Sequence, residues 1–166
     1  GESHLAAADA VIVADRLRPA YLAAPRLRWM HIVGAGLDGF SIPGLREARP
    51  WTNREAVNAK EVPPSLVVLG GGTVGVEMAD AFASFGSRVT VIEASPRVLA
   101  REEPFAGEEV CAAFADAGIE VRADTRATAV SRANGRVTVE LDDGSSVSGD
   151  EILVAVGRRI QSAELG

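Results

Sequence analysis

The sequence predicts an α/β fold built around a parallel β-sheet, and three consecutive features lead to this prediction. A short apolar run at 66–69 is followed directly by a glycine-rich turn at 70–75. Residues 76–85 continue with apolar side chains at helical spacing. A second apolar run at 88–92 ends at the acid Glu93. A strand, turn, helix and second strand in this order form the β-α-β unit from which parallel sheets are built.

The glycine turn has the spacing G-x-G-x-x-G, and each glycine has a physical reason to be there. Gly70 permits the sharp turn out of the strand. Gly72 has no side chain, so a pyrophosphate can approach the backbone, and Gly75 lets the helix pack close to the sheet. The free amides at the start of the helix favour the phosphate charge. The segment therefore predicts a Rossmann-like domain that binds a dinucleotide.

The acid at the end of the second strand indicates which dinucleotide is bound. Glu93 follows the glycine turn by roughly 20 residues, where a carboxylate can accept hydrogen bonds from the adenosine ribose hydroxyls. Its negative charge repels a 2′-phosphate, so the sequence favours NAD over NADP. The alternative is a glycine turn in an α/β domain that binds no nucleotide.

A second glycine turn, at 34–39, has the same spacing but a different continuation. Pro43 and Gly44 prevent a long helix from starting behind it. Without that helix there is no row of free amides for a pyrophosphate. We therefore predict a simple turn here, and a flavin or nucleotide site is the alternative.

The N-terminal part is predicted as an appendage to the main domain. Apolar strands at 11–13 and 29–33 flank a helical stretch at 21–24. A stretch rich in glycine and proline follows. The predicted organisation is a β-α-β appendage at 1–41 and a Rossmann-like domain at 42–166.

Two further helices are predicted around the β-α-β unit. Thr52 or Asn53 can cap a short helix that runs to about Lys60. A longer helix starts near Glu102, and Gly118 is suited to follow its last turn.

From Ile119 onward the apolar period changes from helical to alternating, which indicates strands. Asn134-Gly135 is a strong signal for a hairpin turn, and Asp143-Gly144 marks another. The strands are expected at 119–121, 127–131, 137–141 and 152–156. They predict an antiparallel meander followed by a strand that returns to the centre of the parallel sheet.

Composition excludes several functions. The net charge is −6 and the pI about 5.0, which argues against nucleic acid and anionic membranes as partners. No apolar run approaches the ~20 residues that span a bilayer, and no signal peptide is visible, so a cytoplasmic location is expected.

Cys111 is the single cysteine, which excludes an internal disulfide or a redox-active pair within this sequence. No metal site and no catalytic residue are predicted.

The stretch from about 42 to 157 resembles the pyridine nucleotide–disulfide oxidoreductases, flavoenzymes that include dihydrolipoamide dehydrogenase and mercuric reductase. The resemblance is to their NAD-binding domain. It rests on the motifs at 43–45, 51–53, 62–63, 70–77, 91–93, 137–150 and 152–158.

This resemblance implies additional cofactor contacts. Thr73 and Val74 would lie against the pyrophosphate, and Glu93 against the adenosine ribose. The remaining positions are Glu77 near the nicotinamide, Ala127 near the adenine and Gly157 along the cofactor cleft.

The departures from that family define what the sequence lacks. The FAD domain with its paired redox cysteines is absent, as is the C-terminal domain with its acid–base histidine. Residues 158–161 also differ from the family pattern. The resemblance therefore implies an oxidoreductase module that holds NAD(H) but is incomplete for catalysis alone. FAD would come only from a missing domain or a flavoprotein partner, and a homodimer is the other partner expected.

The first 40 residues resemble part of the substrate domain of D-2-hydroxyacid dehydrogenases, on the motifs at 9–13, 22–29 and 34–38. That resemblance implies that the loop at 33–36 offers amides to a substrate carboxylate. His31 is the only histidine near this loop, and its apolar strand favours a structural role. A natural fusion, a truncated gene product and an engineered chimera are all open. Besides the NAD(H)-binding module, the alternatives are a non-catalytic scaffold or fusion remnant and an enzyme of the 2-hydroxyacid dehydrogenase type.

Overall fold

The structure is a computed structural model that describes residues 10–13, 29–32 and 42–156, with the backbone alone for the first two ranges. The chain divides into two compact units, 1–34 and 35–166, and each is described by itself.

In the first unit, two short strands pair in parallel. They are β1 (Ala10–Val13) and β2 (Trp29–Ile32), and Ala10 lies opposite Trp29. Both strands were predicted from the sequence. The helix expected at 21–24 and the glycine turn at 34–39 lie outside the described residues. The division at 41/42 stays a prediction.

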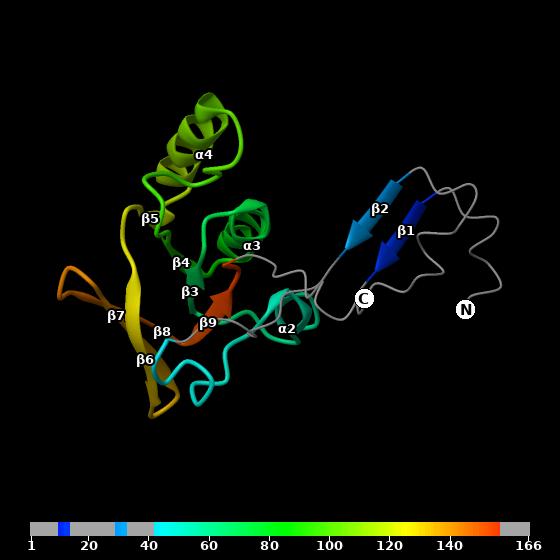
Figure 1. The fold of residues 1–166 in the computed structure, drawn as a ribbon. Helices are drawn as coiled ribbons and strands as arrows, with labels where there is room; N and C mark the ends of the chain where they lie inside the picture. The colour runs from blue at the N-terminus through cyan, green and yellow to red at the C-terminus, as the bar shows by residue number, and fades with distance from the viewer. Residues whose placement is uncertain (1–9, 14–28, 33–41, 157–166) are drawn as a thin grey trace, which may run out of the picture. The chain divides into compact units, whose positions relative to one another are not determined.

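In its described residues, 42–156, the second unit contains two sheets and three helices, which are labelled in Figure 1. The parallel sheet has the order β5-β4-β3-β9. Its strands are β3 (Ser65–Leu69), β4 (Arg88–Ile92), β5 (Glu120–Arg122) and β9 (Glu151–Val154). The antiparallel sheet consists of β6 (Ala127–Ala133), β7 (Arg136–Leu141) and β8 (Ser146–Gly149). The helices are α2 (Asn53–Val57), α3 (Thr73–Ser84) and α4 (Pro104–Asp116).

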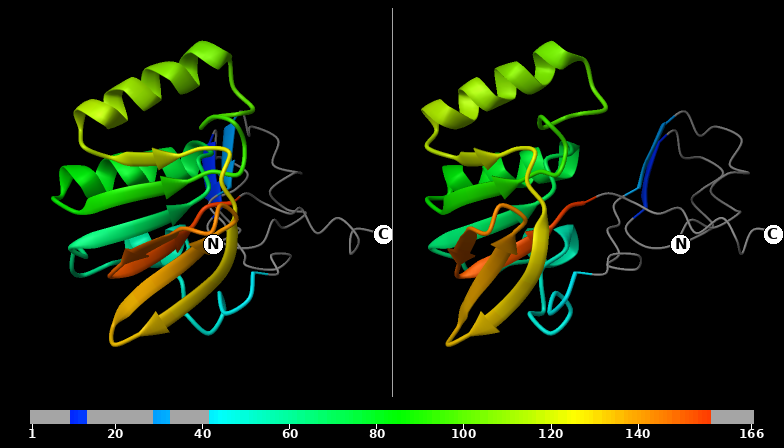
Figure 2. Two further views of the ribbon diagram at one scale, coloured as in Figure 1. Left: turned by 90° about the vertical axis from the view of Figure 1, so that its left-hand side faces the viewer. Right: turned by 60° about the vertical axis from the view of Figure 1, so that its left-hand side comes forward.

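The parallel sheet is buried on both faces, which explains why its central strand is apolar throughout. Leu66 and Val68 of β3 belong to a cluster with Phe82 of α3 and Phe114 of α4. Val67 and its neighbours on the other face belong to a second cluster, which contains the inward side chains of the antiparallel sheet. Figure 2 shows the resulting layers, with helices on one face and β6–β8 on the other. The predicted α/β Rossmann-like fold, with a parallel sheet and a meander, is confirmed.

The helix ends differ slightly from the predicted ones. Thr52, not Asn53, is the N-cap of α2: its hydroxyl accepts the Arg54 amide at 3.2 Å. This helix ends at Val57 rather than near Lys60, because the Asn58 side chain donates to a carbonyl of the last turn at 2.8 Å.

The helix α4 begins at Pro104, two residues later than expected. Proline is favoured in the first turn, where its missing N–H and preset φ cost nothing. At the other end Gly118 follows the C-cap with φ +73°, as its position in the sequence predicted.

The meander contains one strand that the sequence did not reveal. Asn134 and Gly135 have φ of 51° and 78°, the left-handed pair expected of a tight hairpin turn between β6 and β7. The strand β8 pairs with β7 although its sequence is mostly serine and glycine, which have little intrinsic strand preference. The final strand β9 is shorter than the predicted 152–156, since it ends at Val154.

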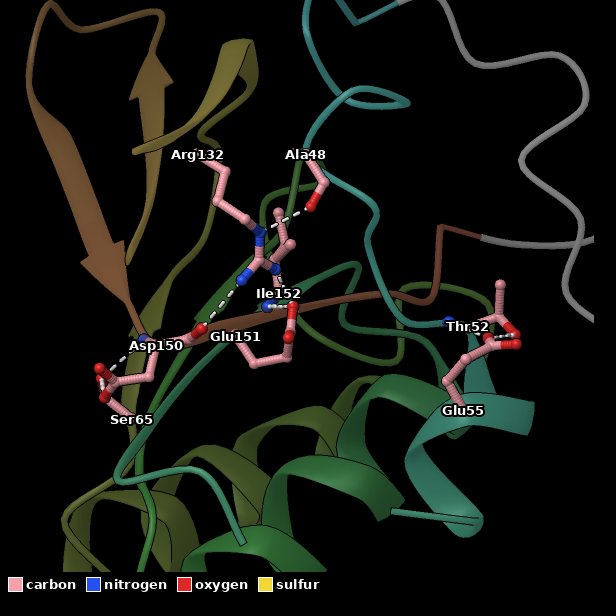
Figure 3. Close-up of polar contacts among 8 residues, drawn as sticks. All are labelled: Ala48, Thr52, Glu55, Ser65, Arg132, Asp150, Glu151 and Ile152. Atoms are coloured by element: carbon pink, nitrogen blue, oxygen red, sulfur yellow. Dashed lines mark hydrogen bonds and ion pairs between the residues drawn. The ribbon is translucent and has the colours of Figure 1, made fainter. Parts of the chain in front are cut away.

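A polar cluster joins the meander to the amino-terminal ends of β3 and β9 (Figure 3). Arg132 of β6 donates to the Ala48 carbonyl at 2.7 Å and forms an ion pair with Glu151. Next to it, the Ser65 hydroxyl donates to the Asp150 carboxylate at 2.6 Å and accepts the Asp150 amide at 3.0 Å. These contacts join the two sheets to the segment before α2, which contains Ala48. They lie at the amino-terminal ends of β3 and β9, and the glycine turn lies at the opposite, carboxyl end of β3. In the described part of the chain, no helix has the length and apolar character needed to cross a bilayer.

Candidate functional site

The candidate site lies at the carboxyl ends of β3, β4 and β9. From β3 the chain continues through α3 to β4 on one side, and it returns through β9 on the other side. This change of direction is the topological switch point at which open α/β sheets bind their ligands. The glycine turn after β3 occupies this position.

Close packing around the turn requires two of its glycines. Gly70 has φ +104°, and a Cβ there would lie 2.6 Å from the Ala155 carbonyl oxygen. A Cβ at Gly75 would lie 1.9 Å from the Gly70 carbonyl oxygen. Both distances are shorter than any van der Waals contact. Gly70 and Gly75 thus allow α3, β3 and the segment after β9 to pack closely. The sharp turn at Gly70 and the close packing of the helix at Gly75 were predicted from the sequence, whereas the contact with the segment after β9 was not.

The second glycine of the motif faces open space. A Cβ at Gly72 would meet no atom within 4 Å. Gly72 is also the N-cap of α3, and no side chain caps the helix there. The amides of Thr73, Val74 and Gly75 have no acceptor within the helix, because they belong to its first turn. A group of donors beside open space can hold an anion such as a pyrophosphate.

The acid at the end of β4 lies against the glycine turn. One Glu93 carboxylate oxygen accepts the Gly71 amide at 2.6 Å, and the other accepts the Ser95 amide at 2.7 Å. The Glu93 carbonyl also accepts the Thr125 amide at 3.0 Å. Glu93 is half-buried, so its charge stands at the rim of the turn. Each carboxylate oxygen retains a second lone pair that can accept a ribose hydroxyl.

The loop after β4, residues 97–102, forms one wall of the candidate site, and no sequence motif marks it. Val98 is fully buried beside Gly71, where a Cβ would lie 2.7 Å from its Cγ1 atom. The Leu99 amide donates to the Gly71 carbonyl at 2.7 Å. The Arg97 guanidinium donates to carbonyls of the same loop. No motif distinguishes these residues, because their role comes from contacts with a turn far away in the sequence.

The remaining predicted residues have different surroundings. Thr73 is exposed, and Val74 is half-buried against the helix-side core. Glu77 is exposed on the second turn of α3. Ala127 opens β6 two residues after Thr125, whose amide binds the Glu93 carbonyl, so it starts near the same edge of the sheet. Gly157 lies outside the described residues.

Within residues 42–156 and the two N-terminal strands, no group of histidine, cysteine or acidic side chains has the arrangement of a metal site. Cys111 is a free, half-buried thiol on α4. The described site therefore consists of backbone amides, a carboxylate and close-packed glycines. Such a site suits binding and orientation of a ligand.

The strand order and the glycine turn at the switch point, with the acid after β4, together define a Rossmann-like α/β domain. The chain belongs to the pyridine nucleotide-disulphide oxidoreductase family, whose sequence profile matches residues 8–165. This confirms the resemblance found in residues 42–157.

Among curated relatives, the mercuric reductase of Acidithiobacillus ferrooxidans is 39% identical over 117 residues. That alignment covers 70% of this chain and 21% of the relative. The dihydrolipoyl dehydrogenase of Chlorobaculum tepidum is 39% identical over 132 residues, which cover 76% of this chain and 28% of the relative. The chain thus spans well under half the length of these relatives.

Solved structures with the same fold agree with this family assignment. The HOCl-induced flavoprotein disulfide reductase RclA from Escherichia coli superimposes with a TM-score of 0.70 at 30% identity, over 80% of this chain and 31% of that one. LpdA from Mycobacterium tuberculosis superimposes with a TM-score of 0.65 at 31% identity, over 74% of this chain and 28% of that one. These comparisons do not test the resemblance of the first 40 residues to D-2-hydroxyacid dehydrogenases, which stays a prediction.

Proposed function

We propose that this chain is the NAD(H)-binding module of a flavin-dependent pyridine nucleotide–disulfide oxidoreductase. The observation that carries the proposal is the open space at Gly72 beside the free amides of α3, with the Glu93 carboxylate bound to the amide of the neighbouring Gly71. Amides favour the pyrophosphate, and the carboxylate favours ribose hydroxyls over a 2′-phosphate. The ligand proposed is therefore NAD(H) rather than NADP(H).

The role proposed for this module is to hold the nicotinamide ring against a flavin. NAD(H) supplies the hydride chemistry when bound, and the protein positions the ring. The flavin belongs to another domain or to a partner protein in this proposal, because the relatives are several times longer than this chain. Glu77 and Gly157 are proposed to lie along the nicotinamide half of the cleft, and Ala127 near the adenine. A cytoplasmic location belongs to the same proposal.

Calorimetric titration of the purified chain with NADH, NADPH and FAD tests the proposal. We expect saturable NADH binding, with NADPH much weaker and FAD not bound. If NADH does not bind, the glycine turn is structural and the chain acts as a scaffold or a remnant. If NADPH binds as tightly as NADH, the role given to Glu93 is wrong.

A further inference from the structure

We propose that Arg97 is a positioning residue for the adenosine half of the dinucleotide, because its guanidinium holds the wall beside Gly71 in place. This inference rests on the proposed function and adds a residue that no sequence motif marks.

The guanidinium is bound entirely by backbone carbonyls of its own loop. Nη1 donates to the Leu99 carbonyl at 2.7 Å. Nη2 donates to the Glu102 carbonyl at 2.8 Å and to the Ala100 carbonyl at 3.3 Å. An arginine presents several donors in a rigid plane, and hydrogen bonds from a charged donor are the stronger kind. Arg97 therefore closes residues 97–102 into one compact turn.

The turn contains a residue in a conformation that needs support. Leu99 has φ +50°, in the left-handed region that side chains other than glycine rarely adopt. Both polar backbone atoms of Leu99 have partners: its amide donates to the Gly71 carbonyl at 2.7 Å, and its carbonyl accepts from Arg97 and from the Glu102 amide at 2.9 Å. Strained residues persist only where the surroundings hold them. Removing the Arg97 donors removes part of that support.

The same turn packs against the candidate site. Val98 is fully buried against Gly71, and the Glu93 carboxylate accepts the Gly71 amide. The far side of the loop is also closely packed, since a Cβ at Gly107 of α4 would lie 2.6 Å from the Val98 carbonyl oxygen and 3.2 Å from an Arg97 nitrogen. In Rossmann-like domains the adenosine ribose lies beside the acid at the end of the second strand. The loop held by Arg97 continues from that acid, so its position affects the adenosine half directly.

The test compares Arg97→Ala with Arg101→Ala in the full chain. Arg101 is a matched control because it is exposed in the same loop and has no hydrogen bond or ion pair with any described residue. Amide hydrogen exchange of Leu99 is measured without ligand, with the Val91 amide in β4 as an internal reference. Affinities for NADH and for ADP-ribose, which has the adenosine half but no nicotinamide, are measured well below the unfolding temperature.

We expect Arg97→Ala to accelerate exchange of the Leu99 amide about tenfold while Val91 is unchanged. NADH and ADP-ribose should both bind about tenfold more weakly, as expected for the loss of hydrogen bonds from a charged group. Arg101→Ala should change none of these quantities. If Arg97→Ala does not fold, Arg97→Gln keeps most of the side-chain stem and is measured in the same way.

Three results would overturn the inference. Unchanged exchange at Leu99 would mean that the guanidinium does not hold the loop. Faster exchange with unchanged affinity would mean that the loop does not position the ligand. Weaker NADH binding with unchanged ADP-ribose binding would place the effect at the nicotinamide end. If the unaltered chain binds no NADH, the proposed function fails and the ligand part of this inference fails with it, whereas the exchange rate still reports whether Arg97 holds the loop.

Discussion

The Glu93 carboxylate accepts the backbone amide of Gly71 at 2.6 Å, so the acid at the end of β4 is anchored to the turn at the end of β3. Its second oxygen accepts the Ser95 amide at 2.7 Å. A residue proposed to bind ribose is thus already held by two amides of the protein. The anchoring fixes the carboxylate at the rim of the site before any ligand arrives, which reduces the entropy lost on binding.

Replacing Glu93 with glutamine should weaken the discrimination against NADPH. The neutral amide keeps an acceptor for one backbone N–H but no longer repels a 2′-phosphate. We expect the ratio of NADPH to NADH affinity to rise about tenfold, a change of about 1.4 kcal/mol. The protein should also lose about 1 kcal/mol of stability with its charged hydrogen bonds. Parallel titrations measure the ratio, and Asp116→Asn is the control because it removes the same charge at the end of α4. An unchanged ratio would contradict the assignment of Glu93.

The glycines of the turn should respond differently to alanine. In Gly75→Ala the new methyl group would lie 1.9 Å from the Gly70 carbonyl oxygen, so we expect a loss of about 2–3 kcal/mol in unfolding free energy. In Gly72→Ala the methyl group meets no atom within 4 Å, and the loss should stay below about 1 kcal/mol. Urea denaturation of the two variants compares these values.

The variants Gly72→Ala and Gly75→Ala also distinguish an effect on stability from an effect on NADH binding. The Gly72→Ala methyl group would occupy the space proposed for the pyrophosphate, so this variant should fold normally and yet lose NADH binding. Normal NADH affinity in folded Gly72→Ala would show that the ligand does not approach the backbone there.

The Ser65–Asp150 pair should make stability depend on acid pH. The Ser65 hydroxyl, and to a smaller extent Arg136, hold the pKa of Asp150 below its ordinary value of 3.8. A lowered pKa in the folded state means that the stabilisation is fully present above pH 3.8 and is lost as the pH falls through the lower folded value. Asp150→Asn should therefore flatten the decline of the melting temperature in this acid range.

Ser65→Ala provides the control for that prediction, because it removes the main cause of the pKa shift and leaves the carboxylate. The double variant should resemble Asp150→Asn alone, since the two side chains act as one unit. Additive effects of the two substitutions would show that the hydrogen bond does not couple them.

An apolar surface between α2 and α3 should promote self-association. Val57 and Phe85 are 69% and 66% exposed, and they border a hollow of about 280 Å³. Exposed apolar patches of this kind are normally covered by another surface. We expect light scattering to show dimers or larger species at high concentration, and the double variant Val57→Lys/Phe85→Lys to reduce them. Phe105→Lys, at an equally exposed position on α4, is the control. A monodisperse monomer in the unaltered chain would contradict this prediction.

The parallel pair β3–β4 and the glycine turn between them were predictable because the residues responsible are neighbours in the sequence. An apolar run, a glycine turn and a helical period occur in one continuous stretch, and their order alone specifies the β-α-β unit. The hairpin at Asn134-Gly135 was equally clear, since its two left-handed residues are adjacent. The strand β8 was missed because its serines and glycine carry little local preference, and only pairing with β7 makes it a strand.

In the candidate site, too, some residues were predictable from local sequence and others depend on the tertiary structure. Glycine spacing and the acid at the end of the second strand identify Gly70, Gly72, Gly75 and Glu93 from local sequence alone. The hydrogen bond from Gly71 to Glu93 and the burial of Val98 against the turn join residues more than twenty positions apart in the chain. The hydrogen bonds of Arg97 are local, but the role proposed for it depends on the contact between its loop and Gly71. Chain folding brings them together, and side-chain hydrogen bonds and close packing carry no periodic signal that a sequence could display.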